Sequence, residues 1–461
     1  MKNKIKYLLI PIGMVWAYSS LWLSDDCFVT FRYISNLFAG NGLVYNVGEY
    51  VEGFTHPLWL LMLLPFNGSL EIASQVLGLI SFAGVIYLLT RSGWLAALLV
   101  VLNLEMRIWA TGGLETMFFT FLVLLSVWAV KKDWVGWILL AMVLTRPDGL
   151  LIAGIVLLFN WKAYKPLLLL IPLLVLRYYY YGDVLPNTYY AKLGTDFAQG
   201  FYYIWAYISV YISTFLILLG FRHIKEKEIA LPMAIIFAYL TLFVAKVGGD
   251  FMYARFIIPI IPLTYFIIEQ SLKKYKNVAL LVGVCFLVVF EMNFRNEMFY
   301  DEAGEHKPAF ELQGVTDEQW YWSHDLGSGQ NLIEMNETLG SGIGEFLGDK
   351  RFVILLRSQC AFAYYLGVGQ TCVMSEGLTD WYIARLPGEG RIGHQKKAPL
   401  EYIKDRGVNF LFNRQSLGNY YGIKIDNQRG TLNLPKMRVG VEVITVDEKV
   451  KELFNPSGNS K

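Results

Sequence analysis

The chain has 461 residues, of which 55% are hydrophobic and 17% are charged, and with its 41 glycines about 64% of it is apolar. An average soluble domain is roughly 45 to 50% apolar and 25% charged, so this composition argues against a soluble enzyme and excludes a disordered chain. The net charge of +2 is too small to suggest nucleic acid as a partner.

The charged residues are unevenly distributed along the chain. Residues 1–292 contain 21 Lys and Arg and 16 Asp and Glu, about 13% of that stretch, whereas residues 293–461 contain 19 and 22, about 24%. We therefore expect a transmembrane domain over 1–292 and a soluble domain over 293–461.

The apolar runs predict a polytopic helical protein. Lys2, Lys4 and Lys6 precede an apolar run that ends at Leu23 without a small-residue cleavage site, which indicates an uncleaved first span. Later runs bring the expected number to about eleven crossings. With the N-terminus in the cytoplasm, the connectors on that side are all net basic, as the positive-inside rule requires. Residues 57–66 would rise only about 15 Å as a helix, so we expect a re-entrant or interfacial segment.

The opposite face collects the polar loops. These are the first loop (24–56), the short loops 111–116, 145–149, 182–196 and 248–255, and the soluble domain. A membrane protein with its acids, arginines and glycine-rich loops on one face is expected to work at that face.

The soluble domain alternates short apolar runs with turns. Strands are expected within 351–357, 371–378, 408–412 and 441–446, and helices at 328–340 and 398–406. This pattern favours a small α/β module. Its sequence contains no nucleophile-elbow motif, phosphate loop or metal-ligand cluster. We therefore expect this domain to bind a ligand or to shape the site rather than to perform chemistry alone.

Cysteine and histidine spacing gives one structural hypothesis. Cys360 and Cys372 lie twelve residues apart on the expected outer face, where a disulfide can persist, and two unpaired thiols are the alternative. The five histidines are scattered without metal-ligand spacing, which argues against a structural zinc site.

The first outer loop opens with two adjacent acids. Ser24 followed by Asp25 and Asp26 is typical of a helix start, with Ser24 as N-cap. The helix expected over 28–40 is amphipathic and would lie in the membrane interface. A charge beside lipid is costly unless it is paired or used. A partly desolvated carboxylate can have a raised pKa and accept a proton from a hydroxyl, which is the functional interpretation.

These residues also resemble a known family. The run DDCFVTFRYISNLFAGNGLVYNVGEYVEGFTHPLW (25–59) is similar to the first periplasmic loop of the mycobacterial terminal β-(1→2)-arabinofuranosyltransferases and their bacterial relatives. The resemblance continues through GLET (113–116), RPDG (146–149), LPNTYYAK (185–192), GGDFMYARF (248–256) and GLTDWYIARLPGEGRIGHQK (377–396). His56 departs from the family pattern, in which Asn is expected.

The resemblance implies a fold and a location. The fold is that of the C-type glycosyltransferases (GT-C), a polytopic α-helical membrane protein with about eleven transmembrane helices and a C-terminal soluble α/β domain. The location is the bacterial cytoplasmic membrane, with the N-terminus in the cytoplasm and the C-terminal domain in the periplasm.

The resemblance also implies an activity. The enzyme would move a sugar, arabinofuranose or another monosaccharide, from a polyprenyl-phosphate donor to a glycan or glycolipid acceptor. Asp25 and Asp26 would be the catalytic pair, one of them the general base. Candidate cations for the departing phosphate are Arg32, Arg146, Lys192 and Arg255. Candidate sugar or acceptor contacts are Glu52, His56, Glu115, Asp148, Asn187, Tyr189 and Asp250. A divalent cation, Mg²⁺ or Mn²⁺, held by the two aspartates and the phosphate is compatible with the spacing but not required by it.

Each candidate has a structural alternative. Arg146 can pair with Asp148, Arg255 with Asp250, and Lys192 can reach lipid headgroups. For the whole chain, the alternatives are a glycolipid transporter or flippase and a membrane scaffold that binds glycan without chemistry. The charges gather at one interface rather than at the midplane, which disfavours transport.

Overall fold

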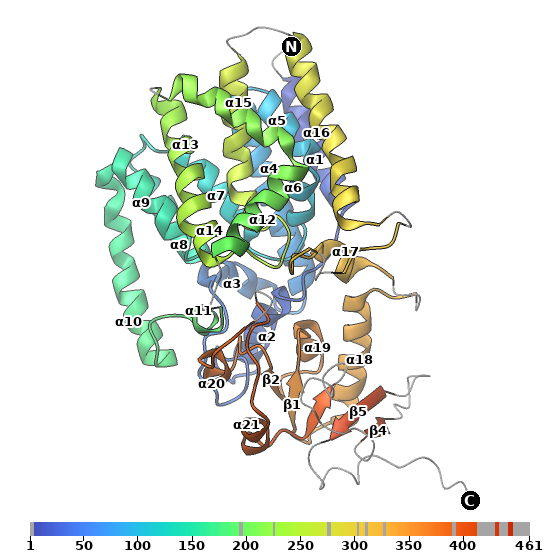
Figure 1. Ribbon diagram of the computed structural model, residues 1–461. Coiled ribbons are helices and arrows are strands. Elements are labelled where there is room, and N and C mark those ends of the chain that lie inside the picture. Colours follow the sequence, from blue (N-terminus) through green and yellow to red (C-terminus); the bar gives the residue numbers. More distant parts are fainter. Residues whose placement is uncertain are drawn as a thin grey trace, which may run out of the picture. The chain divides into compact units, whose positions relative to one another are not determined.

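A computed structural model describes residues 4–192, 197–224, 226–273, 278–301, 304–308, 312–325, 329–389, 393–412, 429–432 and 441–445 (Figure 1). The chain divides into two compact units, each built from three segments. The helical unit comprises Met1–Ser24, Thr55–Leu174 and Thr195–Tyr321, and the sheet unit comprises Asp25–Phe54, Val175–Gly194 and Trp322–Lys461. The first loop of the sequence therefore clusters with the C-terminal segment.

The helical unit consists of packed apolar helices. Its elements are η1 (Ile5–Leu8), α1 (Leu9–Tyr18), α3 (Pro57–Leu63), η2 (Leu64–Phe66), α4 (Leu70–Ser92), α5 (Leu95–Leu102), α6 (Leu104–Trp109), α7 (Thr116–Trp128), α8 (Val135–Thr145), α9 (Gly149–Phe159), η3 (Trp161–Leu169), α12 (Phe197–Val210), η4 (Ile212–His223), α13 (Lys227–Ala238), η5 (Tyr239–Val244), α14 (Ala245–Val247), η6 (Ile258–Ile260), α15 (Ile261–Leu272) and α16 (Val278–Phe299). Helices α10 (Leu170–Tyr181) and α17 (Glu318–Ser323) contain residues of both units. Helix α4 packs against α1, α5 and α7, and α15 packs against α5 and η4.

Within the described residues, two helices are long and apolar enough to cross a membrane. They are Leu70–Ser92 and Glu228–Val247, and the pair Phe197–Val210 and Ile212–His223, bent by 96°, adds a third if it forms one span. Several apolar helices are shorter, among them Pro57–Phe66, which is as short as the sequence predicts. The expectation of an apolar helical protein is thus confirmed, while the number of eleven spans and their orientation stay predictions.

The sheet unit contains a five-stranded mixed sheet. Its elements are α2 (Cys27–Phe38), α11 (Asn187–Ala191), α18 (Leu332–Leu347), β1 (Val353–Leu356), α19 (Cys360–Tyr365), β2 (Thr371–Met374), α20 (Trp381–Ala384), α21 (Leu400–Asp405), β3 (Phe410–Phe412), β4 (Arg429–Leu432) and β5 (Val441–Thr445). The strand order is β2-β1-β3-β5-β4. Strand β1 is parallel to β2 and β3, and β5 is antiparallel to β3 and β4. The small α/β module is therefore confirmed.

Local sequence explains the core of this module. Asn331 and Glu334 form a reciprocal capping box that starts α18, and Figure 1 shows α18 alongside α19, which it contacts. The core cluster consists of Leu355, Val373, Ile383, Ala398, Ile403 and Val408. These apolar side chains come from β1, β2, α20, α21 and the segments that flank α21, as expected for a sheet covered by helices.

Helix α2 differs from its prediction in two ways. It begins at Cys27 with Asp26 in the N-cap position and no side-chain capping bond, so Ser24 is not the cap. Most of its residues are buried, and Phe28 packs on the rings of Tyr364 and Tyr365 at 5.5 and 5.6 Å. Helix α19 therefore covers part of the apolar face, whereas Leu37 and Phe38 of the same face are 37% and 56% exposed, and the interfacial location stays a prediction.

The proposed disulfide is also wrong, since Cys360 and Cys372 are both free and buried. The β1–α19–β2 connection explains their separation. Cys360 starts the helix after the carboxyl end of β1, whereas Cys372 lies inside β2 in register with Ile354.

Candidate active site

The carboxylate of Asp25 is anchored by main-chain amides at the start of α19. Its two oxygens accept hydrogen bonds from the N–H groups of Cys360 and Ala361, both at 2.8 Å. Burial raises the pKa of Asp25 to about 6, against the lowering effect of these bonds, and the charge of Asp26 raises it further. Asp25 is thus a fixed carboxylate that titrates near neutral pH.

Asp26 occupies a different environment. It is half-buried, whereas Asp25 is only 3% exposed. It stands in the N-cap position of α2 without a capping bond from its side chain. The two acids are therefore not equivalent, because the more accessible one is Asp26.

Arg32 has the contacts of a structural residue. It is fully buried, and its guanidinium donates to the carbonyl oxygens of Tyr45, Ala363, Gly367 and Gln370. A guanidinium has five N–H donors, so this set leaves little with which to bind a phosphate. The contacts argue against the phosphate role that the sequence suggested for Arg32.

Glu52 pairs with Arg177, an arginine outside every motif of the sequence. Its Oε2 lies 2.7 Å from Nε of Arg177, a residue inside a run expected to span the membrane. Burial raises the pKa of Glu52 to about 7, although Arg177 lowers it. The apolar neighbours of Arg177 in α10 hid this partner from sequence reasoning.

Asn187 connects two motifs of the sheet unit. Its side-chain amide donates to the carbonyls of Gly377, Leu378 and Asp380 at 2.8, 3.1 and 3.1 Å, and its Oδ1 accepts from Arg385 at 3.0 Å. All of its polar atoms are therefore engaged in holding LPNTYYAK against GLTDWYIAR. These contacts favour a structural role for Asn187.

The two other candidates in the LPNTYYAK motif are more accessible. Tyr189 is 50% exposed, and Lys192 is half-buried at the C-cap of α11.

The helical unit contains a buried charged cluster centred on Glu115. Oε1 of Glu115 lies 3.3 Å from Nη1 of Arg146 and 3.5 Å from Nη2 of Arg255, and Oε2 lies 3.5 Å from Nδ1 of His56. All four residues are buried. The loops GLET, RPDG and GGDFMYARF, far apart in the sequence, thus meet within one unit.

Three further side chains complete this cluster. Nε of Arg146 lies 3.0 Å from Oδ1 of Asp148, and Nη1 of Arg255 lies 3.6 Å from Oδ2 of Asp250. Both pairings were the structural alternatives read from the sequence. Tyr239 donates to Oδ2 of Asp148 at 2.5 Å, a contact that no sequence signal indicated. Its helix η5 is a π-helix, a form frequent at functional sites.

Backbone geometry places these groups. Gly248 and Gly249 have φ of 85° and 76°, and a Cβ on Gly249 would lie 2.5 Å from Cβ of Tyr203. Only glycine meets both conditions, so this turn carries Asp250 to its place. The guanidinium of Arg146 lies 5.3 and 5.1 Å from the rings of Phe119 and Phe256, which fix its plane.

The cluster keeps Glu115 ionised. Burial alone would raise its pKa, but His56 in its protonated form and the charges of Arg255 and Arg146 lower it to about 2. Burial lowers the pKa of His56, against the effect of Glu115, and the two arginines lower it further. His56 is therefore neutral near pH 7, and the guanidinium groups provide the positive charge.

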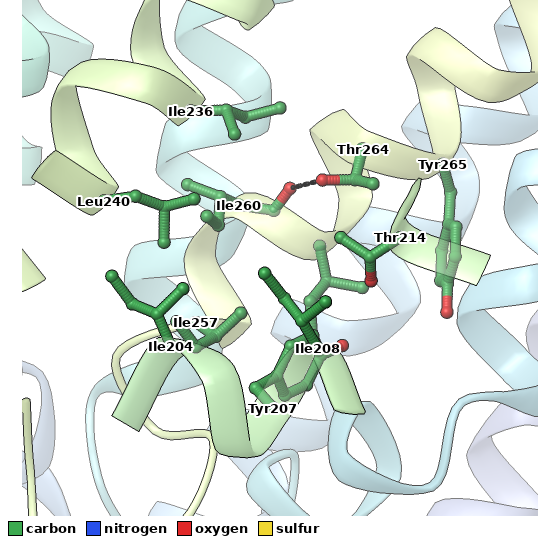
Figure 2. A pocket seen from close by; sticks show the side chains of 11 residues that line it. Ile204, Tyr207, Ile208, Thr214, Ile236, Leu240, Ile257, Ile260, Thr264 and Tyr265 are labelled. Atoms are coloured by element: carbon green, nitrogen blue, oxygen red, sulfur yellow. Dashed lines mark hydrogen bonds between the residues drawn. The ribbon is translucent and has the colours of Figure 1, made fainter. Parts of the chain in front are cut away.

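An apolar pocket lies elsewhere in the helical unit. Figure 2 shows Ile204, Tyr207 and Ile208 of α12 facing Ile236 and Leu240, with Ile257, Ile260, Thr264 and Tyr265 along another side. Its polar atoms are hydroxyls, and that of Thr264 donates to the carbonyl of Ile260 at 3.1 Å. Its lining contains no charged side chain, and its volume of about 30 Å³ is that of a small packing void rather than of a site for a phosphate or a lipid chain.

The suggested divalent cation would have two protein carboxylates, those of Asp25 and Asp26, as ligands. Each oxygen of Asp25 accepts one amide bond and keeps a second lone pair. Within the described ranges, no group of three or more His, Cys, Asp or Glu side chains could hold a metal ion.

The sequence is similar to two terminal β-(1→2)-arabinofuranosyltransferases. It is 27% identical to that of Mycobacterium tuberculosis over 234 residues, a match that covers 40% of this chain and 37% of that protein. It is 24% identical to that of Corynebacterium glutamicum over 347 residues, covering 54% of this chain and 48% of that protein. The matches thus span less than half the length of either relative. No family model and no solved structure matches the chain.

Proposed function

We propose that the protein is a membrane glycosyltransferase that takes its sugar from a polyprenyl-phosphate donor and passes it to a cell-surface glycan or glycolipid. The observation that carries the proposal is the acid pair that opens α2, with Asp25 anchored by two amides and Asp26 more accessible beside it. The distant similarity to arabinofuranosyltransferases supports the reaction class.

Asp26 is the proposed general base. A base must approach the acceptor hydroxyl to within hydrogen-bond reach, and the half-buried Asp26 meets this condition better than the buried Asp25. In this mechanism Asp26 removes the hydroxyl proton as the acceptor oxygen attacks the anomeric carbon, and the bond from that carbon to the phosphate oxygen breaks. Asp25 fixes the start of α2 and is a positioning residue.

Arg146 and Arg255 are the proposed ligands of the departing phosphate. Both share Glu115, which stays ionised and holds the two guanidinium groups in one place. Arginine binds phosphate in a bidentate manner and stabilises the charge that develops on the leaving group. Asp148 and Asp250 then act as orienting partners.

The topology belongs to the same proposal. We propose that the chain crosses the cytoplasmic membrane about eleven times with its N-terminus in the cytoplasm. Transfer then takes place on the outer face, where the first loop and the C-terminal domain lie.

The base assignment is tested with full-length protein in proteoliposomes and a radiolabelled polyprenyl-phosphate pentose. Asp26→Asn is expected to lower the transfer rate by about 10²- to 10⁴-fold, the usual contribution of a general base. Glu401→Gln, which neutralises an exposed acid on α21, is the matched control and should transfer like the wild type. If Asp26→Asn transfers sugar like the wild type, Asp26 is not the general base. If only Asp25→Asn loses transfer, Asp25 is the general base instead.

Transport is the weaker function. A transporter built on broken helices is expected to have them in corresponding positions of two repeats, whereas the described residues contain one bent pair. Donor consumption distinguishes the two functions, because a flippase returns the glycolipid chemically unchanged.

A further inference from the structure

A second pocket lies in the sheet unit, at the carboxyl ends of two parallel strands. Arg357 and Ser358 directly follow β1, and Ser375 and Glu376 directly follow β2. The connection from β1 leads to β2 on one side, and the next connection returns past β1 to β3 on its other side, so the order of the strands reverses beside β1. Ligands of open α/β sheets bind at such switch points, outside the carboxyl ends of the strands.

Hydrogen bonds join residues 386–389 and 393–397 to each other and to this end of the sheet. Nε2 of His394 lies 2.8 Å from Oγ of Ser358, and this hydroxyl donates to Oε1 of Glu376 at 3.1 Å. Nζ of Lys396 donates to the carbonyl of Leu386 at 2.5 Å. The position of His394 is therefore fixed by the strand ends.

The backbone around the pocket has strained or close-packed positions. Ser358 has φ of 46°, a left-handed conformation that is uncommon for a residue other than glycine. A Cβ on Gly388 would lie 3.0 Å from the carbonyl oxygen of Gln395, so the two limbs of the loop approach closely. Strained residues of this kind cluster at ligand sites.

The pocket has the size and lining of a small-molecule site. It has a volume of about 570 Å³, within the range of roughly 300 to 1,000 Å³ that such sites occupy. Arg357, His394 and Lys397 line it together with Glu389. The lining thus contains two cations and one acid, and Nε of Arg357 also lies 3.8 Å from Oε1 of Glu376. The guanidinium has further N–H donors for an anion, and the amide and imidazole groups of the lining can bind hydroxyls.

We propose that this pocket binds a saccharide that carries a carboxylate or a phosphate, as the acceptor of the reaction. Arg357 and Lys397 would hold the anionic group, since guanidinium and ammonium groups are the usual protein ligands of carboxylate and phosphate. His394 and Glu389 would contact sugar hydroxyls. The role of this saccharide as the acceptor rests on the proposed transferase function, whereas its binding to the pocket does not.

The other explanation is a solvated polar loop without a ligand. Lys397 and Glu389 are exposed, as in any surface loop. Three independent features favour the site: the hollow, the left-handed Ser358 and the position at the strand ends. A solvated loop needs none of them.

The test measures binding by full-length protein in detergent, without any donor. The probes are glucuronate, glucose 6-phosphate and glucose, and calorimetry measures the affinity of the protein for each of them. At least one anionic probe is expected to bind roughly tenfold or more tightly than glucose, because charge-assisted hydrogen bonds are about twice as strong as neutral ones. Whether the carboxylate or the phosphate binds more tightly identifies the anion.

Variants locate the binding. Arg357→Gln and Lys397→Gln should each weaken binding of the anionic probe roughly tenfold, whereas Lys404→Gln, on the exposed face of α21, should not. Arg357→Lys should restore part of the affinity and serves as the folding control. Equal binding of glucose and both anions, no binding at all, or an unchanged affinity in both Gln variants would each overturn the inference. Sugar transfer by the wild type would still support the proposed function in those cases.

Discussion

The sharpest physical prediction concerns Asp25, whose burial makes folding depend on pH. Burial raises its pKa from 3.8 to about 6, a difference of about 2.2 pKa units, which corresponds to about 3 kcal/mol. The folded state holds the proton more tightly than the unfolded state. The stability contribution of the protonated group is therefore fully present below about pH 4 and is lost as the pH rises through about 6.

Asp25→Asn removes this titration. The amide accepts one of the two N–H groups of Cys360 and Ala361 through its oxygen but presents an NH₂ group to the other, so the variant is less stable than the wild type at pH 4. The advantage of the wild type over the variant should then shrink by about 2.4 kcal/mol between pH 4 and pH 7, because part of the full change already lies below pH 4. The comparison isolates Asp25, because every other titrating group is present in both proteins.

Hydrogen exchange of the full-length protein measures this difference. Opening free energies of peptides from β1 and α19 are compared at pH 4, 5, 6 and 7, after correction for the intrinsic pH dependence of exchange. Glu401→Gln serves as the exposed control and should show no such trend. A difference between wild type and Asp25→Asn that stays constant across these pH values would refute the reasoning. A stability difference that grows with pH would mean that the two amide hydrogen bonds lower the pKa of Asp25 more than burial raises it.

Two further predictions concern buried charges. The carboxylate of Glu115, whose pKa is lowered from 4.5 to about 2, contributes about 3 kcal/mol above pH 4.5 and loses it as the pH falls through 2. Glu115→Gln should therefore lower the unfolding temperature at pH 7 by several degrees, and an unchanged melt would contradict the pairing with Arg146 and Arg255. Arg32→Lys should destabilise the sheet unit by at least about 2 kcal/mol, because an ammonium cannot serve four carbonyls in the geometry of a guanidinium. Denaturant unfolding checks this, and wild-type stability of Arg32→Lys would contradict the structural role.

The sequence predicts the parts of the fold whose pattern is local. Four strands and two helices of the soluble module follow from apolar runs and turns. Strand β4 (Arg429–Leu432) was missed because RGTL contains only one apolar side chain besides its glycine. The helix α2 was found with nearly correct ends, but its burial was not, because the covering helix α19 lies more than 300 residues away in the chain.

Among the site residues too, only local contacts are predictable from the sequence. The pair Arg146 and Asp148 is predictable, since the two residues lie close together in RPDG. The contact of Glu115 with Arg255 joins loops 140 positions apart, and the anchoring of Asp25 by Cys360 joins positions 335 apart. Long-range contacts of this kind leave no mark in one sequence. Only the folded structure therefore shows Arg32 among backbone carbonyls and Asp25 in an environment different from that of Asp26.

The central claim is the use of a lipid-linked sugar, and one measurement tests it most directly. Membranes containing the full-length protein, or Asp26→Asn as control, are incubated with radiolabelled polyprenyl-phosphate pentoses and hexoses and with cell-envelope glycan. The account predicts that the wild type consumes at least one donor and transfers its label to glycan, while Asp26→Asn leaves that donor intact. If the wild type leaves every donor unchanged, or if both proteins consume it equally, the account is contradicted.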